Sequence, residues 1–178
     1  MDLIGNYFFR EMEVWIMEEF REIPFFKQAK IQAQFLVPLI RGFQDEVGEE
    51  QTNRIVGKVM DDYWRKFGQD YGVSHEGNPV EKMVGLLSFF SAGDAHEFEM
   101  VKLTSDALEM NVTRCPYAEF YKELGASQLG FLLVCHLDFA VAEGLSPKLE
   151  LVRTQTIMEG ASHCDFRYRL QENRTRSD

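Results

Sequence analysis

The chain has 178 residues, a length typical of one domain and sufficient for a hydrophobic core without disulfide or metal cross-links. Hydrophobic residues make up 45% and charged residues 27%, which excludes a disordered, collagen-like or membrane-embedded protein. Its 29 acidic and 19 basic residues give a net charge of −10, so the surface repels nucleic-acid phosphates and anionic lipids. We therefore expect neither nucleic acid nor a membrane as a partner.

The cysteine content and the start of the chain indicate a reducing compartment. Three cysteines are a low and odd number, and Met1-Asp2-Leu3 does not resemble the start of a secretion signal. The apolar run from Leu129 to Val134 is far shorter than the ~20 residues of a membrane-spanning helix. We expect a cytoplasmic protein whose partner is a small-molecule substrate, with monomer and homo-oligomer both left open.

The first half of the chain is predicted to be helical. Apolar residues recur at helical spacing in three stretches, 3–20, 35–43 and 55–71. The sequence Asn78-Pro79-Val80-Glu81 is a capping box with proline at the first helical position, and it predicts the start of a fourth helix. That helix is expected to end at Gly93, where a left-handed C-cap favours glycine.

The second half changes period. Apolar and polar residues alternate over 108–113, which predicts a half-buried strand, and Pro116 then begins a short helix that reaches Leu124. The stretch 129–141 is apolar on nearly all sides and predicts a buried helix. Alternation returns at 149–151 and 166–170, which predicts a strand hairpin.

This order of elements is typical of an α+β fold. We expect a single domain, 1–178, in which a helical part, 1–93, packs with a small antiparallel sheet formed by the C-terminal half. The α+β part, 94–171, carries every cysteine of the chain. The sequence contains no internal repeat, low-complexity stretch or linker.

Cys115 occupies a position that favours a reactive thiol. It ends the predicted strand and immediately precedes the helix that begins at Pro116. The positive end of that helix dipole would lower the pKa of the thiol and favour the thiolate, which attacks carbon or binds metal. The alternative, a cysteine that only packs at the end of a strand, stays open.

Cys135 and Asp138 are three residues apart on the buried helix and therefore share one face. A carboxylate at such a position is costly to bury unless hydrogen bonds or a charge partner compensate it. Asp138 either orients groups and accepts protons beside a thiol, or caps a loop, or pairs with Arg153 or Arg167. His136 lies on a different face, so we do not include it in the site.

Cys164 begins the last predicted strand, and alternation turns its side chain inward while Asp165 takes the other side. His163 and Asp165 are each either proton-transfer groups or solvated residues of the hairpin. Three thiolates and a carboxylate form a plausible zinc ligand set, but the sequence has no CxxC pair. Motifs of nucleotide-binding proteins, zincins and serine hydrolases are also missing from the sequence.

Four stretches follow one another in a specific order, 112–125, 135–139, 153–160 and 163–168. In this order they resemble the L-2-amino-thiazoline-4-carboxylic acid hydrolase family, over residues 105 to 170. A weaker likeness is to the vinyl-reductase-type small-molecule-binding domains, some of which hold zinc through cysteines. Thr156 stands where one of those cysteine ligands is expected, which weakens the zinc alternative.

The resemblance implies hydrolytic opening of a cyclic amidine to an N-carbamoyl product. A thiolate adds to the ring carbon between nitrogen and sulfur, the ring sulfur leaves as a thiol, and water releases the carbamoyl group. No cofactor is expected for this chemistry. The alternative is a non-catalytic, sensor-like domain that binds a small molecule or zinc.

For the hydrolase, Cys115 is the first choice as nucleophile and Cys135 the second. Arg153 or Arg167 would pair with a substrate carboxylate through a bidentate fork. The full set of predicted catalytic residues is Cys115, Cys135, Asp138, Cys164 and Asp165. The predicted substrate-binding residues are Arg153, Arg167, Thr156 and His163.

Overall fold

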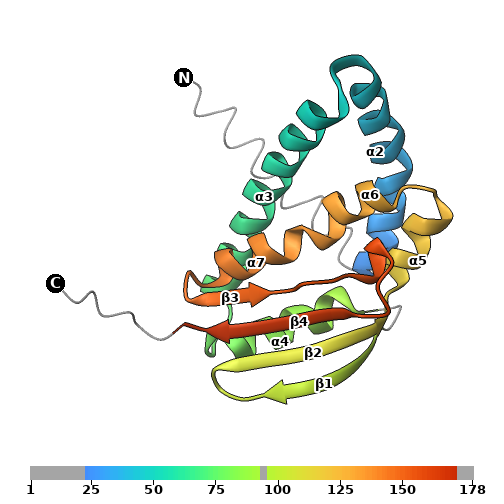
Figure 1. Ribbon diagram of the computed structural model, residues 1–178. Helices are drawn as coiled ribbons and strands as arrows, with labels where there is room; N and C mark the ends of the chain where they lie inside the picture. The colour runs from blue at the N-terminus through green and yellow to red at the C-terminus, as the bar shows by residue number, and fades with distance from the viewer. Residues whose placement is uncertain (1–22, 93–95, 172–178) are drawn as a thin grey trace, which may run out of the picture.

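The computed structural model describes residues 23–92 and 96–171, so the predicted helix over 3–20 lies outside the described residues. The predicted helix end at Gly93 is wrong, because the fourth helix ends at Phe90 with Ser91 as its C-cap. The predicted α+β fold is confirmed (Figure 1). In chain order the elements are α2 (Phe25–Val47), α3 (Glu49–Ser74), α4 (Pro79–Phe90), β1 (Glu97–Leu103), β2 (Ala107–Arg114), α5 (Pro116–Glu123), α6 (Ser127–Gly130), the π-helix η1 (Phe131–Cys135), α7 (Leu137–Leu145), β3 (Leu149–Val152), the 3₁₀-helix η2 (Ile157–Glu159) and β4 (Cys164–Leu170).

The strands form one antiparallel sheet in the order β1-β2-β4-β3. Strand β1 was missing from the sequence prediction. Every residue of β1 is exposed, because this strand forms the edge of the sheet. Figure 1 shows α7 lying along β3 and the α2–α3 pair rising away from the sheet.

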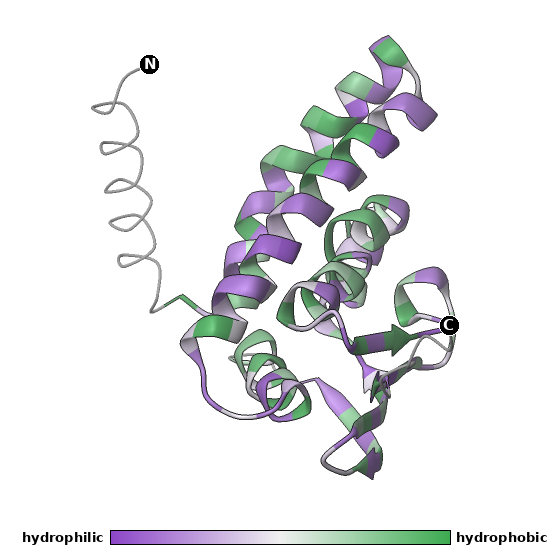
Figure 2. Ribbon diagram, turned by 90° about the vertical axis from the view of Figure 1, so that its left-hand side faces the viewer, coloured by the Kyte–Doolittle hydropathy of each residue, from purple (hydrophilic) through white to green (hydrophobic). Residues whose placement is uncertain are grey.

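Helices α2 and α3 extend the predicted stretches at both ends and form a hairpin. Gly48 alone separates them, with a φ of +92° that a residue without a side chain adopts most easily. The buried face of α2 includes Ala33 and Val37, while Phe35 and Val59 remain exposed on the outer side of the hairpin. Figure 2 accordingly shows hydrophobic and hydrophilic residues alternating along both helices.

The predicted start of α4 is confirmed in its atomic detail. The side-chain oxygen of Asn78 accepts hydrogen bonds from the backbone N–H groups of Val80 and Glu81. The Glu81 carboxylate in turn accepts the Asn78 backbone N–H at 2.8 Å, which completes a capping box beside Pro79. The apolar face of α4 is buried at Val80, Met83 and Leu86.

The apolar stretch at the centre of the fold is buried, as predicted. Elements α6, η1 and α7 follow one another from Ser127 to Leu145. Among the described residues, this segment is the one candidate that is long and apolar enough to cross a membrane, and 56% of it is buried inside the fold. Such burial is typical of the core helix of a soluble domain.

Strands β3 and β4 form the predicted antiparallel pair, with Leu149 opposite Leu170 and Val152 opposite Arg167. Their connection is longer than the predicted hairpin turn, since residues 153–163 form a loop that contains η2. This loop packs η2 against α5 and α6 and thereby covers one end of the core.

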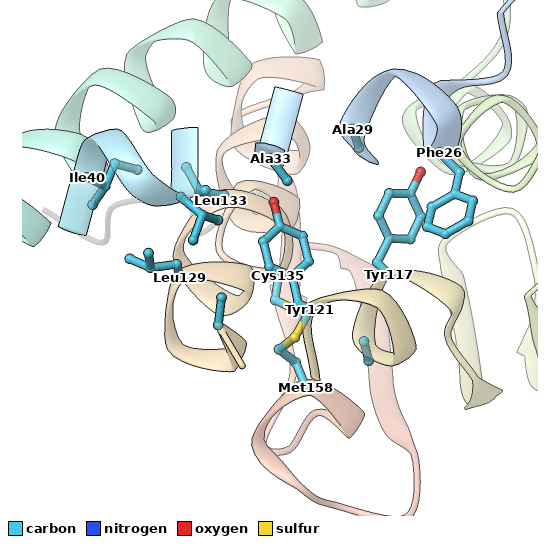
Figure 3. Close-up of a cluster of buried hydrophobic side chains, with 13 residues drawn as sticks. Phe26, Ala29, Ala33, Ile40, Tyr117, Tyr121, Leu129, Leu133, Cys135 and Met158 are labelled. Atoms are coloured by element: carbon cyan, nitrogen blue, oxygen red, sulfur yellow. The ribbon is translucent and has the colours of Figure 1, made fainter. Parts of the chain in front are cut away.

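The core contains two large clusters of buried side chains. One joins α2 to α5, η1 and η2, and Figure 3 shows Cys135 among its side chains together with Tyr121, Leu133 and Met158. The other lies between α3, α4, α7 and the sheet and includes Trp64 and Tyr168. The cysteine-bearing segments are thus fixed by packing on both sides.

Helices α3 and α7 cross where both have a glycine, and this crossing allows a prediction. A methyl group at Gly68 would meet the Val141 carbonyl, and one at Gly144 would meet the Arg65 carbonyl. We expect Gly68→Ala and Gly144→Ala to lower the free energy of unfolding by about 1–3 kcal/mol, measured by urea denaturation. Gly42→Ala is the matched control, since a methyl group there meets nothing within 4 Å, and we expect it to stabilise the protein by about 0.5–1 kcal/mol. A fall in stability of the same size for Gly42→Ala would show that close helix packing is not the cause.

Candidate functional site

A cavity of about 280 Å³ lies between α4, the sheet and the helical segment formed by η1 and α7. The sulfur-bearing side chains of Cys115, Cys135 and Cys164 all line it, although they are distant in the sequence. Asp138 and Arg153 line the same cavity. The structure therefore brings five of the predicted site residues together around one space.

Cys115 lies at the junction of β2 and α5, as the sequence indicates. Burial raises the pKa of its thiol from 9.0 to about 11, while the backbone amides of Ala118 and Tyr117 act in the opposite direction. The prediction of a lowered pKa at this helix start is wrong, because loss of solvent outweighs the helix end. At neutral pH the group is a thiol, so attack on carbon requires a base.

The imidazole of His96 lies beside this thiol, and the sequence analysis missed it. Its Nε2 atom lies 3.6 Å from the Cys115 Sγ atom, and both residues line the cavity. The imidazole stacks on the Tyr117 ring, with centroids 5.5 Å apart and planes 24° from parallel, which fixes its orientation. A thiol beside an imidazole is a common arrangement of a cysteine nucleophile.

The sequence did contain a signal for this contact. The stretch from Glu97 to Met100 alternates acidic and apolar residues, and it lies shortly before the predicted strand over 108–113. An antiparallel hairpin of the two strands places Glu97 opposite Arg114, as the structure does. His96 and Cys115 each lie one residue beyond this pair, and their side chains meet there at 3.6 Å.

Asp138 pairs with Arg153, which is one of the alternatives that the sequence left open. An Nη1 donor of Arg153 bonds to Asp138 Oδ2 at 2.5 Å, and an Nη2 donor bonds to the Cys135 carbonyl at 2.8 Å. The side chains of Arg153 and Asp138 are 2% and 23% exposed. Burial raises the pKa of the Asp138 carboxyl, and the adjacent guanidinium opposes that rise.

Two aromatic rings complete the surroundings of the guanidinium. The Arg153 Cζ atom lies 5.1 Å from the ring centroids of both Phe139 and Phe166. Cation–π contacts of this kind are strongest where water is excluded. Arg153 is therefore held from several sides in a fixed position.

The other two thiols are more deeply buried than Cys115. Cys135 packs within the cluster of Figure 3, and burial raises its pKa well above 9.0. Cys164 accepts the backbone N–H of Ile157 at 3.2 Å, and burial raises its pKa as well. Both line the cavity, but Cys115 is the thiol with an imidazole at hydrogen-bonding distance.

Asp165 and Thr156 do not line the cavity, and both hold the loop between β3 and β4. The Asp165 carboxylate accepts the backbone N–H groups of Thr154 and Gln155 at 2.9 Å each. The Thr156 hydroxyl accepts the Glu159 backbone N–H at 3.1 Å and so caps η2. Their observed contacts stabilise the segment that carries Arg153.

Arg167 and His163 also lie outside the cavity lining. Arg167 donates to the Met110 carbonyl and to the Asn111 side chain, both at 2.8 Å, and thus links β4 to β2. The His163 ring lies 3.0 Å from the Gln155 side-chain nitrogen. Neither side chain reaches the space that Cys115 borders.

The described part of the chain contains no set of side chains that could bind zinc. Within residues 23–92 and 96–171, no group of three or more His, Cys, Asp and Glu side chains is arranged to hold a metal ion. The cavity at Cys115 is instead bordered mainly by apolar side chains.

The comparison with known families identifies the chain. The model of the family described as L-2-amino-thiazoline-4-carboxylic acid hydrolase matches residues 28–168. The chain belongs to this family. The family match covers α2 and α3 as well as the cysteine-bearing half, so it extends beyond the stretches that carry the resemblance in the sequence.

Two solved structures are also similar to this member of the thiazoline-carboxylate hydrolase family. They are the Fe(II) unliganded H-NOX protein from K. algicida and a mutant of the same protein. Each has a TM-score of 0.46 and 10% sequence identity, and the match covers 79% of this chain and 74% of that chain. No curated protein matches the sequence significantly.

The raised pKa of Cys115 predicts how its reactivity depends on pH. Only the thiolate reacts with iodoacetamide, so we expect alkylation of Cys115 to be slow at pH 7 and to rise about tenfold per pH unit up to pH 9.5. Peptide mass spectrometry of the intact, folded protein measures the rate at each cysteine, with Cys115→Ser as the control. A rate that levels off below pH 8 would contradict the raised pKa.

The Arg153–Asp138 pair predicts a large effect on stability. We expect Arg153→Met to lower the free energy of unfolding by about 3–5 kcal/mol, because it leaves a buried carboxylate without its partner. The double variant Arg153→Met/Asp138→Leu should recover part of that loss in urea denaturation. Lys66→Met removes the exposed pair with Asp70 and should change stability by less than about 1 kcal/mol. Equal losses for Arg153→Met and the double variant would argue against an important ion pair.

Proposed function

We propose that this protein is a hydrolase that opens a C–N or C–S bond of a small cyclic amidine or amide, with Cys115 as the nucleophile. The observation that carries the proposal is the Cys115–His96 pair, at 3.6 Å, on the wall of a cavity. The family to which the chain belongs is named for a hydrolase of this kind. The substrate is a small molecule, in keeping with the cavity volume of about 280 Å³.

In the first step, His96 Nε2 takes the Cys115 proton as the sulfur adds to the ring carbon between nitrogen and sulfur. The bond from that carbon to the ring sulfur then breaks. The imidazolium returns the proton to the departing sulfur, which leaves as a thiol that stays attached to the substrate. The product of this step is an isothiourea in which the former ring carbon is bonded to the Cys115 sulfur.

In the second step, water adds to the same carbon while His96 takes a proton from it. The bond to Cys115 breaks, the proton passes to the enzyme sulfur, and a carbamoyl product leaves. One water molecule is consumed and the enzyme returns to its starting state. The role of His96 changes from base to acid within each step, which suits an imidazole.

Arg153 and Asp138 act as positioning residues in this proposal. Their pairing fixes Cys135 and the start of α7 in the wall of the cavity that Cys115 also lines. The fixed wall keeps the reacting carbon within reach of the sulfur, and such orientation lowers the entropic barrier of a bond-forming step. Cys135 and Cys164 contribute bulk to the same wall.

A second candidate is a domain that binds a small molecule without reaction. The observation that favours it is the burial of all three thiols, which raises each pKa and leaves them protonated at neutral pH. In that case His96 and Cys115 would only contact the ligand. Turnover distinguishes the two candidates.

The proposal predicts the effects of two substitutions. With 2-amino-2-thiazoline-4-carboxylate as the assay substrate, we expect Cys115→Ser to abolish release of the ring thiol. We expect His96→Asn to lower kcat/KM by about 10²–10⁴ and to shift the pH–rate profile upward, since the thiolate then forms only at high pH. The released thiol is measured with a chromogenic disulfide.

His75→Asn is the matched control, because His75 is an exposed histidine at the end of α3 outside the cavity. It should leave kcat/KM and the pH profile unchanged. Undiminished turnover by Cys115→Ser would rule out Cys115 as the nucleophile. Tight binding by the wild type without turnover of any ring would support the second candidate.

A further inference from the structure

The hairpin of α2 and α3 leaves a large apolar surface uncovered. Exposed apolar side chains recur every fourth residue along both helices, so on each helix they form one row. Phe35 is 74% exposed and Val59 is 61% exposed. The row on α2 consists of Ile31, Phe35, Leu39, Phe43 and Val47, and the row on α3 consists of Ile55, Val59 and Tyr63.

The two rows lie level with each other along the hairpin. The Gln44 side chain donates a hydrogen bond to the Asn53 side chain at 2.8 Å, which fixes the register of the two antiparallel helices. Both helices rise ~1.5 Å per residue, so residues whose numbers sum to about 97 lie at the same height. The row on α3 is therefore level with positions 34–42 of α2. The eight side chains thus belong to one stretch of the hairpin.

These rows lie outside both the core and the candidate site. The buried face of α2 includes Ala33 and Val37 instead, and none of the eight side chains belongs to the core clusters of the described chain. None of them lines the cavity of Cys115. An apolar surface of this kind marks a contact with another segment or molecule.

The first part of the chain carries a matching row. Residues 1–22 lie outside the described residues and join the hairpin at the start of α2. The apolar residues of the predicted helix over 3–20 include five at the same fourfold spacing. These are Ile4, Phe8, Met12, Ile16 and Phe20.

The two rows of five also agree in length. Each extends over about 24 Å, which is 16 residues at ~1.5 Å per residue. In an antiparallel arrangement, each member of one row lies beside one member of the other. Phe20 is then next to Ile31 at one end, and Ile4 is next to Val47 at the other.

The connection to α2 allows this arrangement. Pro24 precedes α2 with a φ of −51° and a ψ of 138°, so a helix over 3–20 does not continue into α2. From Phe20 to Phe25 the chain can span about 17 Å. Ile31 lies only about 9 Å along α2 from Phe25. The chain can therefore turn back at Pro24 and bring Phe20 level with Ile31.

From the matching rows and this connection we propose that residues 3–20 bind as a helix, antiparallel to α2, along the apolar surface of the hairpin in the same chain. Phe8 then lies beside Phe43, and Met12 lies beside Leu39. Removal of the aromatic and aliphatic side chains of both rows from water supplies the driving force. The bound segment keeps a second copy of the chain away from this surface.

Two thiols introduced into the full-length chain test the contact. In Phe8→Cys/Phe43→Cys the introduced thiols are adjacent, and we expect oxidised glutathione to link them within one chain. In the matched control, Phe8→Cys/Asp45→Cys, the second thiol is also exposed on α2 but points to the opposite side of that helix. We expect its disulfide to form about tenfold more slowly or less. Peptide mass spectrometry after blocking of free thiols measures both rates.

Equal rates for the two pairs, or no disulfide in either, would overturn the proposal. A disulfide that joins the introduced thiols of two chains would also overturn it, because a second copy would then cover the surface. Urea denaturation establishes that both double variants are folded.

Hydrogen exchange provides a test without introduced thiols. We expect the backbone amides of residues 3–20 to exchange at least about tenfold more slowly than in an unfolded chain, and Phe35→Ser to remove most of this protection. Val101→Ser is the matched control and should leave the protection unchanged, because Val101 is 53% exposed on β1 rather than on the hairpin. Exchange over 3–20 as fast as in an unfolded chain, or unaffected by Phe35→Ser, would contradict the proposal.

Discussion

The buried pair of Arg153 and Asp138 fixes the relative positions of the elements that form the cavity. Arg153 follows β3, whereas Asp138 lies in the first turn of α7, so their bond ties the sheet to the central helix. In a regular α-helix the Phe139 N–H would bond to the Cys135 carbonyl. Here, just after the π-helix η1, the Phe139 N–H bonds to the His136 carbonyl, and the Cys135 carbonyl accepts a hydrogen bond from Arg153 instead. A π-helical turn inside an α-helix often marks a functional site. Here it turns a backbone carbonyl toward the one cation of the cavity wall among the described residues.

Burial also controls the protonation state of the Cys115 thiol. A rise of the thiol pKa from 9.0 to about 11 corresponds to about 3 kcal/mol against the thiolate. The end of a helix offers a charge only about 0.3–1 kcal/mol, which explains why the helix that begins at Pro116 does not produce a thiolate. In the proposed mechanism, the adjacent imidazole of His96 is therefore the group that takes the proton from this thiol. The position of Cys115 before a helix favours a lower thiol pKa, but its burial has the larger effect and keeps the thiol protonated.

The sequence predicted correctly the features that depend on contacts between neighbouring residues of the chain. The capping box at Asn78 was exact because its bonds join residues within one turn, and the inward direction of Cys164 followed from strand alternation. The convergence of three cysteines on one cavity could be expressed only as a hypothesis, because it depends on contacts between distant segments. Strand β1 was missed because an exposed edge strand carries little hydrophobic signal, and His96 was missed with it. Pairing 97–103 with 107–114 in the sequence would have placed His96 beside Cys115.

The apolar wall and the proposed thiol chemistry require each other. In a cavity bordered mainly by apolar side chains a thiolate is poorly solvated, so Cys115 rests as a thiol beside His96. Proton transfer becomes favourable only when the electron pair of sulfur moves into a bond with the substrate. A substrate that fills the cavity also removes water from the sulfur during the first step of the proposed reaction.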